Sequence, residues 1–257
     1  MNETSLHRYF IKMAYRGTRY HGWQIQPNAH TVQAEVNKAI STVLQEAVET
    51  TGAGRTDTGV HARFYIAHFD SAQKNLEKDE QFLFKLNNIL PPDIAASGIY
   101  SVPHTAHARF DALSRTYKYV ISTRKDPFLE EFAFHYYQKP DILQLNRACK
   151  ILKGNRDFCS FSKLHSDVAT YHCNIMEASW KEEGGKYIFT IKADRFLRNM
   201  VRAIVGTMMD IGLHKISLDD FRDIIEKKDR SAAGTSVPPQ GLFLTRIDYP
   251  AHILPHG

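Results

Sequence analysis

Apolar side chains recur along the chain at two spacings, one typical of strands and one typical of helices. Residues 8–16 alternate between apolar and polar positions, which predicts a strand. Residues 31–45 carry an apolar stripe at helical spacing behind Thr31, a good N-cap residue, and so predict a helix. The same tests predict strands over 63–69 and 94–102 and a helix over 81–90. We interpret the order of this half as strand, helix, strand, strand, helix, strand, that of a ferredoxin-like unit, although these ranges cover only one of the two middle strands.

A similar order of elements follows from residue 104 onward, although the letters themselves do not repeat. The elements expected there are strands over 115–122, 173–180, 186–192 and 241–249, and helices over 141–152, 196–212 and 219–227. We therefore predict an α+β fold of two halves, residues 1–105 and residues 106–257. Loop 161–172 and loop 231–240 are expected to be the least constrained segments.

The run GAGRTDTGVHA, residues 52–62, is the segment most suggestive of chemistry. It places one carboxylate, Asp57, in a turn of glycines and small residues between two apolar-alternating segments. Glycine permits positive φ angles and close approach of a ligand, and the neighbouring Arg55 is expected to keep the carboxylate ionised and aimed. These are the requirements of a nucleophilic aspartate.

Other interpretations of this run remain open. Most Asp-Thr-Gly sequences are ordinary turns in which the aspartate bonds its own backbone. An aspartic protease needs two carboxylates, and the chain has no second Asp-Thr-Gly or Asp-Ser-Gly, so that function would require a homodimer. A dinucleotide-binding fingerprint is disfavoured, because Asp57 stands where the third glycine would be and would repel a pyrophosphate.

Composition narrows the class of protein without identifying one. The 257 residues are 43% hydrophobic with a formal charge of +5, which is compatible with a polyanionic partner but does not establish one. The three cysteines form no CxxC pair and are odd in number, so we expect reduced thiols in a cytoplasmic protein and no metal site. No stretch has the length and hydropathy of a signal sequence or a membrane span.

Three segments mix basic and aromatic residues, as surfaces that bind unpaired nucleotides do. In the first, Arg115 and Tyr117 share one face of the strand expected over 115–122. In the second, Arg109 lies beside Phe110. The third, residues 15–26, contains Trp23 among basic residues. Each segment alone is a weak signal. Together they favour a nucleic acid as partner.

The helix expected over 196–212 carries arginines opposite its apolar stripe: Arg195, Arg198 and Arg202. Like charges four residues apart do not stabilise a helix, and cations in its first turn face the positive end of the dipole. The arginines therefore form either a solvated face or a site for an anion, such as an RNA backbone or the Asp57 carboxylate.

The run GAGRTDTGVHA resembles the signature of the tRNA pseudouridine synthases of the TruA family, with Asp57 at the position of their nucleophilic aspartate. Further blocks match in family order over nearly the whole chain: YHGWQ (20–24), TVQAEVNKAI, HARFDALSRTYKY (107–119), ADRFLRNMVRAIVGTMMDIG (193–212) and GLFLTRIDYP (241–250). The departures are modest: Thr58 stands where alanine is common, and loop 161–172 is short and does not align.

The resemblance implies two ferredoxin-like halves whose antiparallel sheets form one continuous sheet, with the active site in a central cleft. It implies that a homodimer isomerises uridine to pseudouridine at positions 38–40 of the tRNA anticodon stem-loop, without a cofactor. The alternatives are a non-catalytic RNA-binding module, which gains nothing from a carboxylate facing phosphates, and a dimeric aspartic protease, which needs none of the basic-aromatic segments.

The resemblance also implies roles for single residues. Asp57 attacks C1′ or C6 of the uridine, or drives loss of the base. Arg55 either fills the gap left by the extruded base or holds a phosphate. The Tyr117 ring stacks on the uracil, and its hydroxyl takes the C5 proton. Arg202 pairs with Asp57. Further contacts to the substrate are expected from Gln24, Arg109, Arg115, Arg195 and Arg198.

Overall fold

The computed structural model describes residues 6–163 and 169–254. By its internal contacts the chain divides into two compact units. The first comprises Met1–Leu113 and Leu244–Gly257, and the second comprises Ser114–Phe243. The last strand, β9 (Leu242–Asp248), begins in the second unit and continues in the first. In this division the C-terminal residues are grouped with the N-terminal ones, whereas the sequence-based division kept each half continuous.

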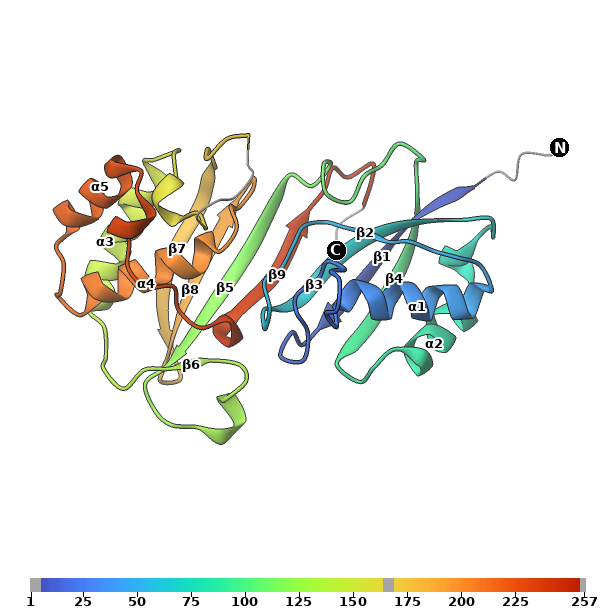
Figure 1. Ribbon diagram of the computed structural model, residues 1–257, viewed down its shortest axis with the longest axis horizontal. Coiled ribbons are helices and arrows are strands. Elements are labelled where there is room, and N and C mark those ends of the chain that lie inside the picture. Colours follow the sequence, from blue (N-terminus) through green and yellow to red (C-terminus); the bar gives the residue numbers. More distant parts are fainter. Residues whose placement is uncertain (1–5, 164–168, 255–257) are drawn as a thin grey trace. The chain divides into compact units, whose positions relative to one another are not determined.

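The first unit contains four long strands and two helices among its described residues (Figure 1). In chain order its elements are β1 (His7–Tyr15), α1 (Val32–Leu44), β2 (Thr51–Gly52), β3 (His61–Ser71), a short 3-10 turn, α2 (Glu80–Ile89) and β4 (Ile94–Val102), joined by the end of β9. The sheet order is β4-β1-β3-β9, with β1 antiparallel to both β3 and β4, while β2 pairs with β3. The order of strands and helices is the predicted one, although sequence did not locate the two-residue strand β2.

The core of the first unit forms because the apolar positions of its elements face one another. The Thr31 hydroxyl caps α1 by accepting a hydrogen bond from the Ala34 amide, and the helix then buries the stripe begun by Val32 and Val36. In β1 the alternating residues that predicted the strand, Tyr9, Ile11, Met13 and Tyr15, are buried, and Phe10 on the opposite face is buried too. Its ring lies 5.4 Å from that of Tyr249, the residue directly after β9. The returning chain therefore covers the second face of β1.

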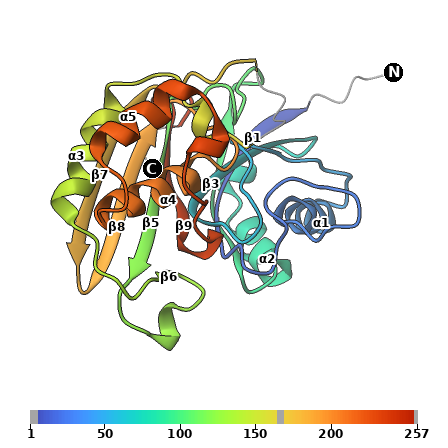
Figure 2. The same ribbon diagram turned by 60° about the vertical axis from the view of Figure 1, so that its left-hand side comes forward.

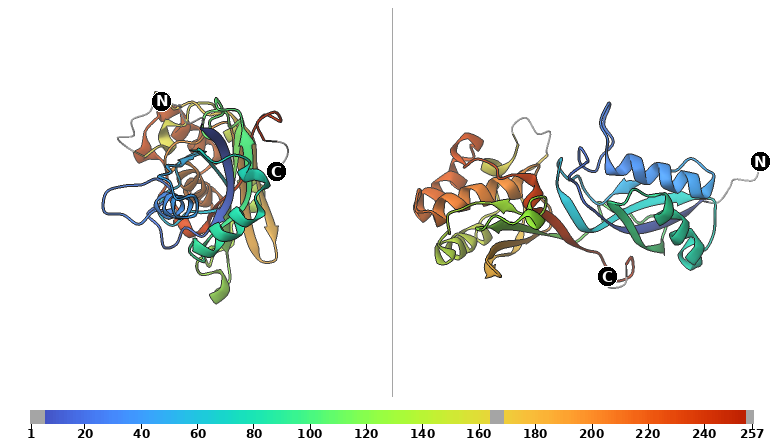
Figure 3. Two further views of the ribbon diagram at one scale, coloured as in Figure 1. Left: turned by 90° about the vertical axis from the view of Figure 1, so that its right-hand side faces the viewer. Right: turned by 90° about the horizontal axis from the view of Figure 1, so that it is seen from below.

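In its described residues the second unit packs three α-helices beside a mixed sheet (Figure 2). Its elements are β5 (Ser114–Ser122), β6 (Phe134–His135), α3 (Ile142–Lys153), β7 (Ile175–Glu183), β8 (Lys186–Ala193), α4 (Met200–Gly212) and α5 (Leu218–Lys227). The long strands run antiparallel in the order β5-β8-β7, and β6 is parallel to β5. Helices α4 and α5, orange to red in Figure 3, lie together with α3. The fold class is α+β, as predicted.

Helix α4 begins four residues later than predicted, at Met200 rather than Phe196. Asn199 has φ 65°, a left-handed conformation that a continuous helix cannot contain. Its side chain is turned away from capping and donates to the Ser236 hydroxyl at 2.6 Å. Arg195 and Arg198 consequently lie on the segment before the helix, and only Arg202 lies within it. The expected i, i+4 relation between Arg198 and Arg202 is wrong.

Of the two loops expected to be weakly constrained, loop 231–240 departs from that expectation. Loop 231–240 is tied to its unit: Arg202 and Tyr119 both donate to its backbone carbonyls. Part of loop 161–172, residues 164–168, lies outside the described residues. In the described part of the chain no helix is long and apolar enough to cross a membrane.

Candidate active site

The glycine-rich turn lies in the first unit, between β2 and β3. Asp57 is half-buried in it, between a buried Thr56 and an exposed Thr58. The Val60 amide donates to the Asp57 carbonyl at 3.1 Å, closing the turn. Gly59 has φ 78°, a conformation that costs an L side chain free energy but glycine little. The turn therefore presents the Asp57 carboxylate on a fixed backbone.

Segment 15–23 is hydrogen-bonded to this turn and stabilises it. The Trp23 amide donates to the Thr56 carbonyl at 3.4 Å, and the Tyr15 hydroxyl shares a 2.9 Å hydrogen bond with the Thr56 hydroxyl. Gly22 lies so close that a Cβ on it would stand 2.2 Å from the Thr56 carbonyl oxygen. Only glycine fits there, and its φ of 87° adds a second reason. The residue before Asp57 is thus held by both its backbone and its side chain.

A second support runs from Gly59 to a buried carboxylate. The Gly59 amide donates to the Tyr20 carbonyl at 3.3 Å, and the Tyr20 hydroxyl donates to Asp93 at 2.5 Å. The Asp93 side chain is 1% exposed, and its other oxygen lies 3.5 Å from the Arg19 guanidinium, an ion pair too long to be a good hydrogen bond. Burial and the adjacent carboxylate raise the pKa of Tyr20, so its hydroxyl remains a donor.

Three other predicted site residues of the first unit lie at its surface. Arg55 is exposed, and within the described residues its guanidinium makes no hydrogen bond or ion pair, including none with Asp57. The expected aiming of Asp57 by Arg55 is therefore not present as a contact. Gln24 and Arg109 are exposed as well. The Arg109 guanidinium lies over the Phe110 ring, 5.6 Å from its centroid.

Tyr117 and Arg115 lie on β5 in the second unit, with their side chains on the same face as predicted from strand periodicity. The Tyr117 ring meets Phe196 edge-on, with centroids 5.1 Å apart. Arg115 donates to the Asp194 carbonyl at 2.9 Å, and the Asp194 carboxylate accepts the Arg195 amide at 2.7 Å. The structure thus gathers Arg115, Tyr117 and the segment carrying Arg195.

Arg202 and Arg198 differ in environment. Arg202 lies in the first turn of α4, half-buried, and its Nε donates to the Val237 carbonyl at 2.8 Å. Its own carbonyl accepts the Val237 amide at 3.2 Å, so the arginine is fixed against loop 231–240. Arg198 is exposed and precedes the helix.

The predicted residues therefore fall into two sets by unit: Gln24, Arg55, Asp57 and Arg109 in the first, and Arg115, Tyr117, Arg195, Arg198 and Arg202 in the second. Sequence reasoning missed the residues that hold the turn: Tyr15, Tyr20, Gly22, Thr56 and Asp93. The motif YHGWQ, whose role sequence left undefined, contains two of them. Within the described part of the chain, no three His, Cys, Asp or Glu residues are grouped to hold a metal ion.

Comparison with known proteins identifies the family. A model of the tRNA pseudouridine synthase family matches residues 11–111 and 148–250. The chain is 51% identical to tRNA pseudouridine synthase A of Parabacteroides distasonis over 251 residues, which are 97% of this chain and 99% of the relative. It is 50% identical to the Bacteroides fragilis enzyme of the same name over 97% of this chain and 99% of the relative. A Thermoanaerobacter sp. relative, also named tRNA pseudouridine synthase A, is 39% identical over 93% of this chain and 98% of its own length.

These matches cover both compact units and include the turn around Asp57. The family resemblance inferred from GAGRTDTGVHA is therefore confirmed, and the chain belongs to the tRNA pseudouridine synthase A family of isomerases.

Proposed function

We propose that this chain isomerises uridine to pseudouridine at positions 38–40 of the tRNA anticodon stem-loop, with Asp57 as nucleophile and without a cofactor. The observation that carries the proposal is the placement of Asp57, a half-buried carboxylate on a turn fixed through Thr56 and Gly59. A nucleophile held in one geometry does not lose orientational freedom when the substrate arrives. The TruA resemblance supplies the substrate and the role.

The proposed reaction balances without an added group. The N1–C1′ glycosidic bond breaks, the uracil turns, and a C5–C1′ bond forms; C5 then loses its proton and N1 gains one. Extruding the base from its stack costs a few kcal/mol. Attack of Asp57 at C1′, attack at C6, and assistance to loss of the base all agree with one carboxylate in this position.

We assign four residues to this reaction. Three of them act on the same uridine: Asp57 of the first unit, and Tyr117 and Arg202 of the second. Arg55 occupies the gap that the extruded base leaves in the RNA, or holds a phosphate. The Tyr117 ring stacks on the uracil and its hydroxyl removes the C5 proton. Exposed Arg55, with no partner among the described residues, is available for an anionic ligand. Gln24, Arg109, Arg115, Arg195 and Arg198 bind the tRNA.

The remaining features of the proposal rest on the family resemblance. Each unit is ferredoxin-like, as the order β1-α1-β2-β3-α2-β4 of the first supports, and the halves, divided near residue 105, share a continuous sheet with a central catalytic cleft. The enzyme acts as a homodimer in the cytoplasm, where unpaired thiols such as those of Cys149 and Cys173 persist.

The test is to incubate the protein with tRNA carrying tritium at C5 of its uridines. Isomerisation replaces the C5–H bond, so label should appear in water in step with pseudouridine at positions 38–40. A transcript with cytidine at those three positions is the matched control and should release none. Wild-type protein that binds tRNA but releases no label would contradict the proposed reaction.

A further inference from the structure

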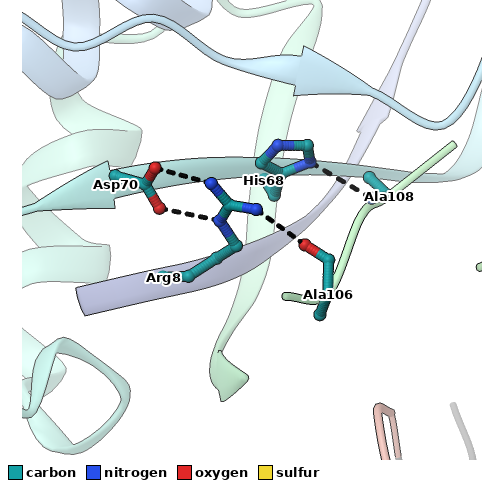
Figure 4. A network of polar contacts seen from close by, with 5 residues as sticks. All are labelled: Arg8, His68, Asp70, Ala106 and Ala108. Carbon is teal, nitrogen blue, oxygen red and sulfur yellow. Dashed lines mark hydrogen bonds and ion pairs between the residues drawn. The ribbon is translucent and has the colours of Figure 1, made fainter. Parts of the chain in front are cut away.

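Side chains distant in sequence hold the backbone of the turn formed by residues 106–111 of the first unit, and Figure 4 shows the bonds at Ala106 and Ala108. Arg8 is held by two hydrogen bonds to the Asp70 carboxylate, at 2.8 and 2.7 Å, and donates to the Ala106 carbonyl at 3.0 Å. The Ala108 amide donates to His68, and the Ala108 carbonyl accepts the Tyr249 hydroxyl at 2.5 Å. Residues from β1 and β3, together with Tyr249 directly after β9, therefore fix this short segment.

His68 and His107 can accept hydrogen bonds from the backbone amides of the turn because their rings are neutral. His68 accepts the Ala108 amide on Nδ1 at 3.1 Å, which requires an unprotonated nitrogen. Burial, reinforced by the nearby Arg8 and His107, lowers the pKa of His68 to about 4. His107 uses its own Nδ1 to accept the amides of Arg109 and Phe110, at 3.1 and 3.3 Å, and burial lowers its pKa as well.

This rigid turn presents an exposed aromatic ring. Phe110 is 74% exposed, yet its ring lies 4.3 Å from the His107 ring, between centroids, and beneath the Arg109 guanidinium. Single exposed apolar residues are common. Phe84 and Phe128 are of that kind: they are 63% and 87% exposed, and neither has a ring or cation contact within the described residues. Phe110 differs because both its backbone and its ring are oriented.

We propose that Phe110 is a stacking platform for an unpaired base of the tRNA, with Arg109 holding the adjacent phosphate. The inference rests on the proposed function for its ligand. An aromatic face next to a guanidinium recognises a nucleotide, because the base stacks on the ring while the cation meets the phosphate. Since the turn is already ordered, binding does not cost the entropy of ordering it.

The test is the affinity for unmodified tRNA of three variants, with folding checked by thermal unfolding. Phe110→Leu removes the π face and keeps an apolar side chain, so the Kd should rise roughly five- to hundredfold. The dependence of log Kd on log salt should not change, because no phosphate contact is lost. Phe84→Leu, at another exposed phenylalanine of the same unit, is the matched control and should bind as the wild type does.

Phe110→Trp supplies a direct signature of stacking. The native tryptophans, Trp23 and Trp180, are buried, so a change in fluorescence on tRNA binding should come mainly from the new indole. Stacking on a base should quench the fluorescence of that indole. Bound tRNA should also protect the indole from quenching by acrylamide. Wild-type affinity in Phe110→Leu, or an indole indifferent to tRNA, would overturn the proposal. A change in oligomeric state in Phe110→Leu, seen by sedimentation, would instead make this ring a contact between two copies. Affinity and label release are separate measurements, so failure of the isomerisation would be seen separately from failure of the stacking.

Discussion

The Tyr20 hydroxyl donates a 2.5 Å hydrogen bond to the buried Asp93 carboxylate, 73 residues away in sequence. The same tyrosine accepts the Gly59 amide on its carbonyl, so Asp93 is linked to the turn that carries Asp57 through a single residue. Asp93 touches neither Asp57 nor, in the proposed reaction, the substrate. We therefore expect it to be a positioning residue.

Removing Asp93 should therefore affect turnover through geometry. Asp93→Ala leaves the Tyr20 hydroxyl buried without an acceptor, which should lower the free energy of unfolding by about 1–3 kcal/mol. We expect kcat to fall and KM to change little. The substitution displaces the turn that carries Asp57 but leaves the tRNA-binding surface of the protein in place. Asp93→Asn retains an acceptor oxygen and should recover most of the loss. Urea unfolding and label release measure the two effects; unchanged kcat in Asp93→Ala would remove Asp93 from the positioning role.

The sequence predicted most of the elements because each depends on a local pattern. Alternation located β1 and β5, and helical spacing with a capping residue located α1. The start of α4 was misplaced because the apolar stripe extends upstream to Leu197, while the left-handed Asn199 is bonded to Ser236 in a distant loop. No local pattern records such a bond.

In the candidate site, too, a local pattern predicted some residues, whereas others depend on contacts between distant parts of the chain. Asp57 was predicted because the glycine-rich run surrounds it in sequence. Asp93 was missed because its importance depends on Tyr20, which only the fold brings to it. Residues that perform chemistry often stand within motifs, whereas residues that hold them in place are scattered along the chain.

Replacing the proposed nucleophile should separate binding from chemistry. Asp57→Asn and Asp57→Ala should abolish label release, because the carboxylate is the reacting group. Their tRNA affinity should change little, since an anion contributes nothing favourable to phosphate binding. Kd and single-turnover rates on the same tRNA are the measurements. Near-wild-type turnover in either variant would contradict the assignment.

Tyr117 combines two proposed roles that a pair of variants distinguishes. Tyr117→Phe keeps the ring and should preserve affinity, but it should lose much of the rate if the hydroxyl takes the C5 proton. Tyr117→Ala should also weaken binding, by about 1–3 kcal/mol for a lost base–aromatic stack. If the phenylalanine variant matches wild-type turnover, the hydroxyl has no part in the mechanism.

The buried His68 should make stability fall in mild acid. Its pKa is about 4 in the folded protein against an ordinary value of 6.5, so the unfolded chain binds the proton more readily. The stabilisation is complete above pH 6.5 and is lost as pH falls towards 4, by about 3 kcal/mol in all.

Unfolding in urea at several pH values tests this dependence. His68→Asn keeps an acceptor near the Nδ1 position but does not titrate, so its stability should decline less over that range than the wild type's. Parallel curves for the two proteins would show that His68 does not cause the decline.

Arg198 and Arg202 should differ in how their loss depends on salt. Arg198 is exposed outside the helix, so we expect it to contact phosphate. Because such a contact releases counterions, Arg198→Ala should raise KM and reduce the salt slope of tRNA binding by about one unit. Arg202 is fixed by Val237 and is proposed to act with Asp57. Arg202→Ala should therefore keep the slope, lose catalysis, and lose about 1.5–3 kcal/mol of stability with its charged hydrogen bond.

Both variants belong in one titration of affinity against salt, with label release measured on the same preparations. Arg195→Ala is a useful third, because Arg195 lies on the same segment before α4 as Arg198; it should behave as Arg198→Ala does. A flattened slope with intact turnover in Arg202→Ala would make Arg202 a phosphate contact and refute its pairing with Asp57. That outcome would leave Asp57 as the nucleophile, but its charge would then need a different partner.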